Sequence, residues 1–261
     1  MNRKLGINVD CIKNDKLWQN LYVIKDAGFE SFFAQDYDDE TLTNLSKVAD
    51  ELGLDFEFIH GPWRGINSLW TADEDPELYF EILECIRQAH KYGVGGIILH
   101  VSSGYTPPEI CDKGLKRYDA IINLAKELGV KVAFENLRKV GNVIYLMDRY
   151  SNEDNVVFCY DFGHAFCYTD KRTPWLDLIG NKTVYTHIHD NFGKTGEENE
   201  DLHLLPFEGL IDYQSIIDKL DEYDYKGSLM LEVFDINNEK KGKDFIFEAY
   251  KRLKKINDMS K

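Results

Sequence analysis

The chain has 261 residues, of which 43% are hydrophobic, and it carries a formal net charge of −15 at pH 7. The length and the apolar content suit one large domain, since α/β barrels reach about 250 residues as a single unit. The negative charge repels phosphodiester backbones, so no nucleic acid is expected as a partner.

Strand and helix patterns then alternate along the whole chain. Short β-forming apolar runs predict strands at 4–10, 29–35, 54–60, 96–101, 131–136, 156–161, 183–190 and 228–234. Apolar residues at helical spacing predict helices at 17–28, 40–53, 77–92, 108–129, 142–150, 175–179, 213–223 and 243–256. Several of these helices close on a glycine, which is the usual signal for a helix end.

Eight strand–helix units in succession predict a parallel sheet with helical crossovers. Within 261 residues they fit an α/β fold of the (β/α)8 TIM barrel type, with residues 1–261 forming a single domain. A doubly wound open sheet is the alternative. It is weakened because no GxGxxG motif follows the first predicted strand.

The cysteines and the apolar runs bear on the cellular compartment. The five cysteines are widely spaced and form no CxxC pair. Together with the lack of a signal-peptide pattern, this spacing predicts reduced thiols in a cytoplasmic protein. No apolar run approaches the ~18 residues of a membrane-spanning helix, so no membrane partner is expected.

Six of the predicted strands end on an acid or a histidine, namely His60, His100, Glu135, Asp161, His187 and Glu232. A polar group at the end of a buried strand costs free energy unless it finds a partner. Active sites of (β/α)8 barrels lie at the carboxyl ends of the strands, so we expect the six side chains to converge there. Alternation by two also predicts that Glu232 shares an inward face with Met230, whereas Leu231 faces the helices.

Three carboxylates and one imidazole from the last four strands predict a divalent-metal site formed by Glu135, Asp161, His187 and Glu232. Without a cation, the adjacent carboxylates would repel one another and take up protons. For each residue taken alone, the alternative is a structural hydrogen bond to a loop amide. His60 and His100, on the two preceding strands, are either further ligands or structural histidines.

Other polar residues follow the same strands. His164 stands three residues after Asp161, so one of the two can serve a metal and the other a substrate or a second metal. His189 shares a face with His187 if the strand is regular. Asp190 is a candidate for orienting a metal-ligating side chain through a hydrogen bond, without binding the metal itself.

Two further segments are candidates for the site. Asp201 and His203 lie in a polar loop, where a solvated role is the simple alternative to ligation. Trp63, in the loop after the third strand, is a candidate pocket wall, and packing is its alternative role.

With these motifs the chain resembles the xylose isomerase-like TIM barrels, which include sugar phosphate isomerases and epimerases and endonuclease IV. The resemblance covers essentially the whole chain. It rests on His60-Gly-Pro, His100, Phe134-Glu135-Asn136, Asp161-Phe-Gly-His164, His187-Ile-His189-Asp190-Asn191, Asp201-Leu-His203, Gly209-Leu-Ile-Asp212 and Leu231-Glu232-Val233.

The resemblance implies ligand sets for two activities. For an isomerase or epimerase it implies one metal on Glu135, Asp161, His187 and Glu232, with the two glutamates also moving protons. For endonuclease IV it implies three zinc ions. The first is held by His60, His100 and Glu135, the second by Glu135, Asp161, His187 and Glu232, and the third by His164, Asp201 and His203. This chain has an acceptable residue at every one of these positions.

Charge separates the two activities, because an endonuclease must neutralise several phosphates. The loops that would face DNA hold few basic residues, namely Arg64, Arg138, Lys139, Lys171, Arg172 and Lys194. We therefore predict a metal-dependent sugar or sugar-phosphate isomerase or epimerase that transfers protons through an enediolate. Its expected catalytic residues are Glu135 and Glu232, and its substrate contacts are His164 and Trp63. An endonuclease IV-like hydrolase and a non-catalytic sugar-binding barrel are the alternatives.

The expected cofactor is Mn²⁺, Mg²⁺ or Zn²⁺, because oxygen-rich coordination suits the first two and added imidazoles favour zinc. More than one ion is compatible with the residues present. The expected partner is a small-molecule sugar, and a homo-oligomer is left open.

Overall fold

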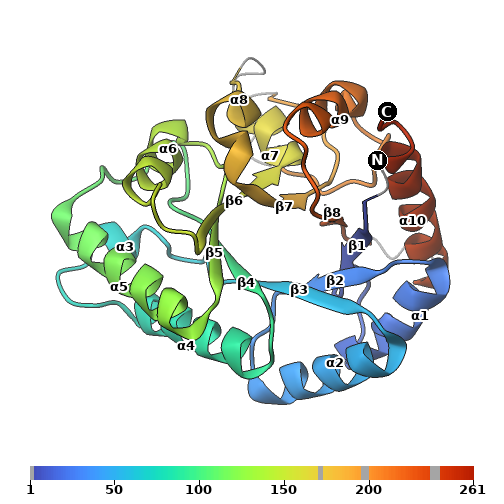
Figure 1. Ribbon diagram of the computed structural model, residues 1–261, viewed down its shortest axis with the longest axis horizontal. Coiled ribbons are helices and arrows are strands. Elements are labelled where there is room, and N and C mark those ends of the chain that lie inside the picture. Colours follow the sequence, from blue (N-terminus) through green and yellow to red (C-terminus); the bar gives the residue numbers. More distant parts are fainter. Residues whose placement is uncertain (1–2, 170–172, 195–199, 236–241) are drawn as a thin grey trace.

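The computed structural model describes residues 3–169, 173–194, 200–235 and 242–261. Its eight strands are parallel and lie in the order β7-β6-β5-β4-β3-β2-β1-β8. The first and last strands of this order also meet, because Ile188 N donates to Met230 O at 2.8 Å. The strands form a ring and the helices cover its outside (Figure 1), so the predicted (β/α)8 TIM barrel is confirmed.

The elements follow the predicted order. The strands are β1 (Leu5–Asn8), β2 (Ser31–Ala34), β3 (Asp55–His60), β4 (Gly96–Leu99), β5 (Lys131–Glu135), β6 (Val156–Asp161), β7 (Thr183–His187) and β8 (Leu229–Leu231). The α-helices are α1 (Asn20–Ala27), α2 (Asp39–Leu52), α3 (Ser68–Thr71), α4 (Glu77–Lys91), α5 (Asp112–Leu128), α6 (Val140–Arg149), α7 (Phe162–Cys167), α8 (Trp175–Ile179), α9 (Tyr213–Glu222) and α10 (Lys243–Asn257). Two 3₁₀ helices are η1 (Leu17–Gln19) and η2 (Gly180–Lys182). No helix in the described ranges has both the length and the apolar character needed to cross a bilayer.

Capping explains where several helices begin and end. The Asp38 side chain accepts a hydrogen bond from Thr41 N at 3.0 Å and so caps the start of α2. Gly53 ends the same helix at φ 61°, a left-handed conformation that a glycine adopts without strain. The short helices α3 and α7 were not expected from the sequence, because both lie in segments interpreted as loops or turns that follow a strand.

The inside of the barrel is built in layers. An apolar cluster fills the ring and comprises Phe33, Phe58, Ile98, Ala133, Val157, Cys159, Tyr185 and Met230. Side chains two positions apart on a strand point the same way, so the next residue inward lies one layer closer to the carboxyl end. Two residues after Phe58, Ile98, Ala133, Cys159, Tyr185 and Met230 come His60, His100, Glu135, Asp161, His187 and Glu232. As predicted, Leu231 belongs instead to the cluster between the sheet and the helices.

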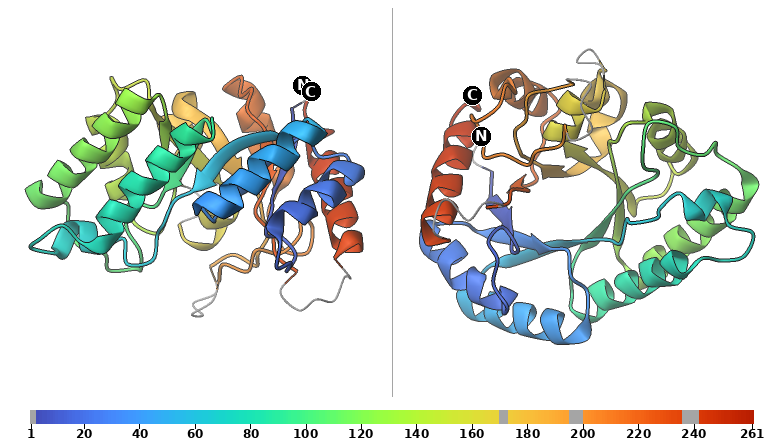
Figure 2. Two further views of the ribbon diagram at one scale, coloured as in Figure 1. Left: turned by 90° about the horizontal axis from the view of Figure 1, so that it is seen from below. Right: turned by 180° about the vertical axis from the view of Figure 1, so that it is seen from behind.

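The two termini lie side by side, next to α10 (Figures 1 and 2). Arg3 is buried there, and its Nη2 lies 2.6 Å from Asp221 Oδ1, which ties the start of the chain to α9. β1 begins two residues later, so this is the end of the barrel where the strands start. The polar layer therefore lies at the opposite end.

Candidate functional site

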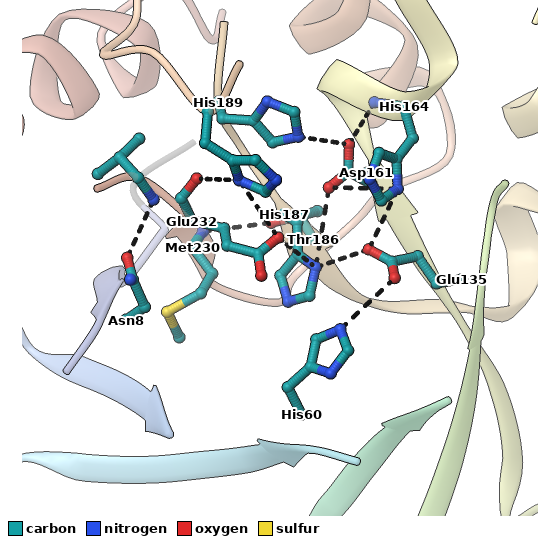
Figure 3. Close-up of polar contacts among 12 residues, drawn as sticks. Asn8, His60, Glu135, Asp161, His164, Thr186, His187, His189, Met230 and Glu232 are labelled. Carbon is teal, nitrogen blue, oxygen red and sulfur yellow. Dashed lines mark hydrogen bonds and ion pairs between the residues drawn. The ribbon is translucent and has the colours of Figure 1, made fainter. Parts of the chain in front are cut away.

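The six strand-end side chains predicted to converge do so at the carboxyl ends of the strands. Glu135, Asp161 and His187 are each the last residue of a strand and are fully buried. Glu232 directly follows β8 and is 5% exposed. Figure 3 shows these four side chains pointing toward one another, with His60 on the facing side.

Four of these residues form what we call the inner cluster, namely Glu135, Asp161, His187 and Glu232. His187 Nδ1 lies 2.7 Å from Glu135 Oε1, 3.4 Å from Glu232 Oε2 and 3.8 Å from Asp161 Oδ2. One ligand atom from each residue lies within 4.8 Å of the others. Ligands bound ~2.0–2.2 Å from an ion are at most about 4.4 Å apart, and the three distances to His187 Nδ1 lie below this limit, so the inner cluster has the dimensions of a cation site.

Electrostatics in the inner cluster favour charge despite burial. Burial opposes ionisation of Glu135, but the facing His187 and His164 hold the pKa of its carboxyl well below the usual range. Burial also opposes a charged His187, yet Cys159, Glu232 and Glu135 raise the pKa of that imidazole well above its ordinary value. The imidazoles thus balance the carboxylates with protons that a bound cation would displace.

A second group, the side cluster, consists of His60, His100 and Glu135. His100 Nε2 lies 2.8 Å and His60 Nε2 lies 3.8 Å from the same oxygen, Glu135 Oε2. The Nδ1 atom of His60 faces the carbonyl of Gly61 at 3.0 Å. Because a carbonyl only accepts, Nδ1 must be the donor, and Nε2 of the neutral ring is left with the lone pair that a metal needs.

A third group, the outer cluster, consists of His164, His189, Asp201 and His203. His164 Nε2 lies 3.1 Å and His203 Nε2 lies 3.3 Å from Asp201 Oδ2. His203 Nδ1 donates to Glu232 O at 2.9 Å, so its Nε2 is again the atom available to a ligand. Burial opposes charge on both rings, but the nearby carboxylates raise the pKa of His164 to about 10 and that of His203 to about 9.

His189 is the site residue that the sequence-based ligand set left out. Its Nε2 lies 3.2 Å from Asp161 Oδ1 and 3.5 Å from Asp201 Oδ1, and the ring stacks on His203 at 4.0 Å. The signal was present in the sequence, because His189 follows His187 by two. Gly163 makes room for the ring, since a Cβ at this position would overlap the His189 imidazole.

Asp190 has a different role from the one considered for it. Its Oδ1 accepts from Asn191 N at 2.9 Å and from Ile211 N at 3.2 Å, and its Oδ2 accepts from Phe207 N at 2.8 Å. The carboxylate therefore fixes the loop between β7 and α9, which carries Asp201 and His203, rather than a histidine ring. These three hydrogen bonds are the physical reason that the Asp190 carboxylate can be buried here without a cation.

Buried polar atoms without hydrogen-bond partners gather at the inner and outer clusters. Among the described residues they include Asp161 Oδ2, His187 Nε2, Asp201 Oδ1 and His189 Nδ1. Buried polar groups are normally satisfied, so their concentration in one place needs an explanation. Carboxylate oxygens and imidazole nitrogens are metal donors, and this donor chemistry fits one or more divalent cations.

A cavity of about 310 Å³ opens above the clusters. Its walls include Trp63, His164, Arg138, Tyr168 and Phe234. The two residues predicted to contact substrate, Trp63 and His164, thus both face it, and the Trp63 ring lies 5.6 Å from that of His100. Lys171 and Arg172, two of the basic residues considered for DNA contact, lie outside the described residues.

Comparison with known proteins places this geometry in a family. The family described as "Xylose isomerase-like TIM barrel" matches residues 21–255. The chain is 26% identical over 208 residues to the uncharacterised protein MJ1311 of Methanocaldococcus jannaschii, which covers 73% of this chain and 68% of that protein. It is 27% identical over 133 residues to the inosose dehydratase of Histophilus somni, a match that spans 44% of this chain and 45% of that enzyme.

Solved structures agree on the fold. D-psicose 3-epimerase with D-tagatose, from Clostridium cellulolyticum, has a TM-score of 0.71 and 15% identity over 97% of this chain and 99% of that chain. The IolI protein with a binding zinc atom has a TM-score of 0.73 and 17% identity over 96% of each chain. At such identities the likeness shows the shared architecture. With the family match over residues 21–255, the chain belongs to the xylose isomerase-like TIM barrel family.

Proposed function

We propose that this protein is a metal-dependent sugar or sugar-phosphate isomerase or epimerase. One observation carries the proposal: Glu135 and Glu232 approach the same nitrogen of His187 from different strands, at 2.7 Å and 3.4 Å. Two carboxylates that meet beside one cavity, of which Glu232 lines it, have the placement of an acid–base pair. The likeness to a D-psicose 3-epimerase and to an inosose dehydratase supports a sugar as the substrate class.

The proposed cofactor is a divalent cation held by the inner cluster. Three carboxylates and one imidazole suit Mn²⁺ or Mg²⁺, and Zn²⁺ also accepts this donor set. The unsatisfied Asp161 Oδ2 supports the assignment, as does the zinc atom of the structurally similar IolI protein. When bound, the cation supplies a Lewis acid to the carbonyl and hydroxyl oxygens of a sugar.

The two glutamates move the proton in this proposal. One removes it from the carbon next to the carbonyl and leaves an enediolate, and the other returns a proton to the neighbouring carbon or to the opposite face. Glu135 is available to accept a proton in its ionised form, because His187 and His164 overcome the effect of burial and keep the pKa of its carboxyl low. His164 and Trp63, on the cavity wall, are the proposed contacts for substrate oxygens.

Turnover on a panel of aldoses, ketoses and their phosphates tests the proposal. The protein is assayed after loading with Mn²⁺, Mg²⁺ or Zn²⁺, and a chelated sample is the control. We expect conversion only with metal, and deuterium from D₂O in the product next to the carbonyl. The absence of conversion with every metal would reject the isomerase, and sugar binding without turnover would leave a non-catalytic sugar-binding barrel.

One observation favours a second candidate, which is phosphodiester hydrolysis with several metal ions. The side cluster and the outer cluster lie beside the inner cluster and offer the imidazole-rich donors that zinc prefers. The net charge of −15 opposes this activity. We expect negligible binding to a duplex with an abasic site at physiological salt. Tight binding with a steep salt dependence, together with strand cleavage, would reverse the order of the two candidates.

A further inference from the structure

Arg138 is the one lysine or arginine among the residues that line the mouth cavity in the described part of the chain. It follows β5 by three residues and is half-buried. Its guanidinium carbon lies 3.5 Å from the centre of the Tyr168 ring and 5.1 Å from that of Tyr105. Two aromatic rings thus hold the guanidinium in position.

The charge of Arg138 is not neutralised within the described residues. Its Nε is buried and has no hydrogen-bond partner, and the guanidinium forms no ion pair with a described carboxylate. Arg117, another arginine that joins separate elements, is different. It binds Asp75 at 2.9 Å and the carbonyl of Leu69 at 2.7 Å, and it donates to three further carbonyls.

This contrast matters because the chain has 46 acidic residues and 31 basic ones. A half-buried arginine in such a chain would ordinarily find a carboxylate, since desolvating an unpaired charge costs free energy. The two acids closest to the aromatic rings are engaged elsewhere. Asp201 accepts from Tyr168 Oη at 2.8 Å, and Glu200 accepts from Tyr105 Oη at 2.6 Å. Arg138 thus lines the cavity with Tyr105 as a hydrogen-bond partner and with no carboxylate paired to it among the described residues.

We infer that Arg138 forms a subsite for an anionic group of the substrate, a phosphate or a carboxylate. A guanidinium donates two parallel hydrogen bonds to either group. Tyr168 links the subsite to the proposed metal centre, because its ring stacks on His164 at 4.8 Å while its hydroxyl binds Asp201. The 310 Å³ cavity lies at the lower end of the ~300–1,000 Å³ typical of ligand sites, which suits a ligand the size of a sugar phosphate or a sugar acid.

The positive charge of Arg138 also favours the entry of an anionic substrate into the cavity. The floor of the cavity is rich in carboxylates, and the whole chain is negative, so an anionic sugar would be repelled from it. Lys194 Nζ lies 5.7 Å from the centre of the Tyr105 ring and adds a second, exposed cation on this side. Arg138 and Lys194 thus make one wall of the cavity mouth positively charged, whereas its floor is negatively charged.

This inference deepens the proposed function and rests on it for the identity of the substrate, but its test uses binding alone. Calorimetry on the zinc-loaded protein compares D-fructose, D-fructose 6-phosphate and D-gluconate as probes. The variants are Arg138→Met, which removes the charge, and Arg138→Lys, which keeps the charge but lacks the two parallel donors of a guanidinium. Lys139→Met is the matched control, because Lys139 is the adjacent cation, lies outside the cavity lining and faces Glu109 at 4.0 Å.

We expect the wild type and Lys139→Met to bind at least one of the two anionic probes more tightly than D-fructose. Arg138→Met should weaken that binding by about 10- to 100-fold, the range for a charged hydrogen-bonded pair, and leave D-fructose unchanged. The affinity of Arg138→Lys for that probe should lie between the affinities of the wild type and of Arg138→Met. If Arg138→Met has lost its circular dichroism signal, the affinity of Arg138→Lys tests the subsite in its place. If Arg138→Met loses affinity only for D-fructose 6-phosphate, the subsite binds a phosphate. If it loses affinity only for D-gluconate, the subsite binds a carboxylate.

Equal affinities of all variants for both anions would overturn the subsite, as would a wild type that prefers D-fructose. The outcome is separate from that of the proposed function. An Arg138-dependent preference for anions in a protein without turnover on the sugar panel would keep the subsite and reject the isomerase.

Discussion

The inner and outer clusters lie side by side but are held in place by different means. Every residue of the inner cluster ends a strand or directly follows one, and each is at most 5% exposed. In the outer cluster, His164 lies on the six-residue helix α7, and the side chains of Asp201 and His203 are 18% exposed on a loop. The sheet therefore fixes the inner cluster, whereas loop contacts such as those of Asp190 place the outer one.

Asp161 shows how the two clusters are joined. Its Oδ2 faces His187 at 3.8 Å in the inner cluster, and its Oδ1 faces His189 at 3.2 Å in the outer cluster. The same Oδ1 accepts from His164 N at 2.6 Å and caps α7, which leaves Oδ2 for the proposed role of a ligand. The difference between the clusters is thus one of rigidity, and it leads to different expectations for their substitution.

The largest effect is expected from the glutamates of the inner cluster. Glu135→Gln and Glu232→Gln each keep the size of the side chain and one ligating oxygen but cannot accept the proton. Turnover at saturating metal should therefore fall by about 10²–10⁴-fold, the usual contribution of an acid or base. Glu57→Gln is the control, because Glu57 is a partly buried glutamate near the start of β3, at the opposite end of the barrel. Full activity of both inner-cluster variants would remove these glutamates from the chemistry.

Metal content should separate the two clusters next. His187→Ala deletes the nitrogen that three carboxylates approach, so we expect the tightest metal to be lost. His203→Ala removes one of several imidazoles from a loop-borne group and should leave that metal bound. Elemental analysis after dialysis measures the ratio of metal to protein. If His203→Ala lost the metal and His187→Ala kept it, the assignment of the primary site would have to be exchanged.

A smaller effect is expected from the glycine that makes room for the outer cluster. Gly163→Ala would push the His189 ring away from Asp201, and the change should weaken any second metal by about 10–100-fold, as for disturbed ligand orientation. Gly141→Ala is the matched control, because open space surrounds this glycine on α6. Titration with Zn²⁺ gives both affinities. Unchanged zinc binding in Gly163→Ala would show that His189 is not a ligand.

The smallest effect is expected at the cavity wall. Trp63 is 40% exposed and contacts no inner-cluster residue through an ion pair or hydrogen bond among those described. Trp63→Ala should raise KM several-fold through lost stacking and leave kcat nearly unchanged. Phe80→Ala on α4 is the control, since this ring is 56% exposed and lies outside the cavity lining. A fall in kcat with an unchanged KM would place Trp63 in the chemistry rather than in binding.

Much of this arrangement follows from the sequence, for a physical reason. Strand ends and alternation by two are local properties, so the inward placement of Glu135 and Glu232 could be predicted, and the structure places both there. The outer cluster depends on where a loop folds back, and its residues were named through a family resemblance. Alternation placed His189 on the same face as His187, but the ligand set followed the family resemblance and so left His189 out. The stacking of Arg138 on Tyr168 was not visible, because it joins the loop after β5 to the end of α7.

The central claim is that the inner cluster holds a catalytic cation. A crystal structure of the protein soaked in Mn²⁺, with anomalous diffraction to locate the ion, tests it most directly. We expect one strong anomalous peak within about 2.0–2.6 Å of carboxylate oxygens of Glu135, Asp161 and Glu232 and of a ring nitrogen of His187. A fully ordered barrel without a peak in the inner cluster, or with the Glu135 and Glu232 carboxylates too far apart to contact one ion, would contradict the account.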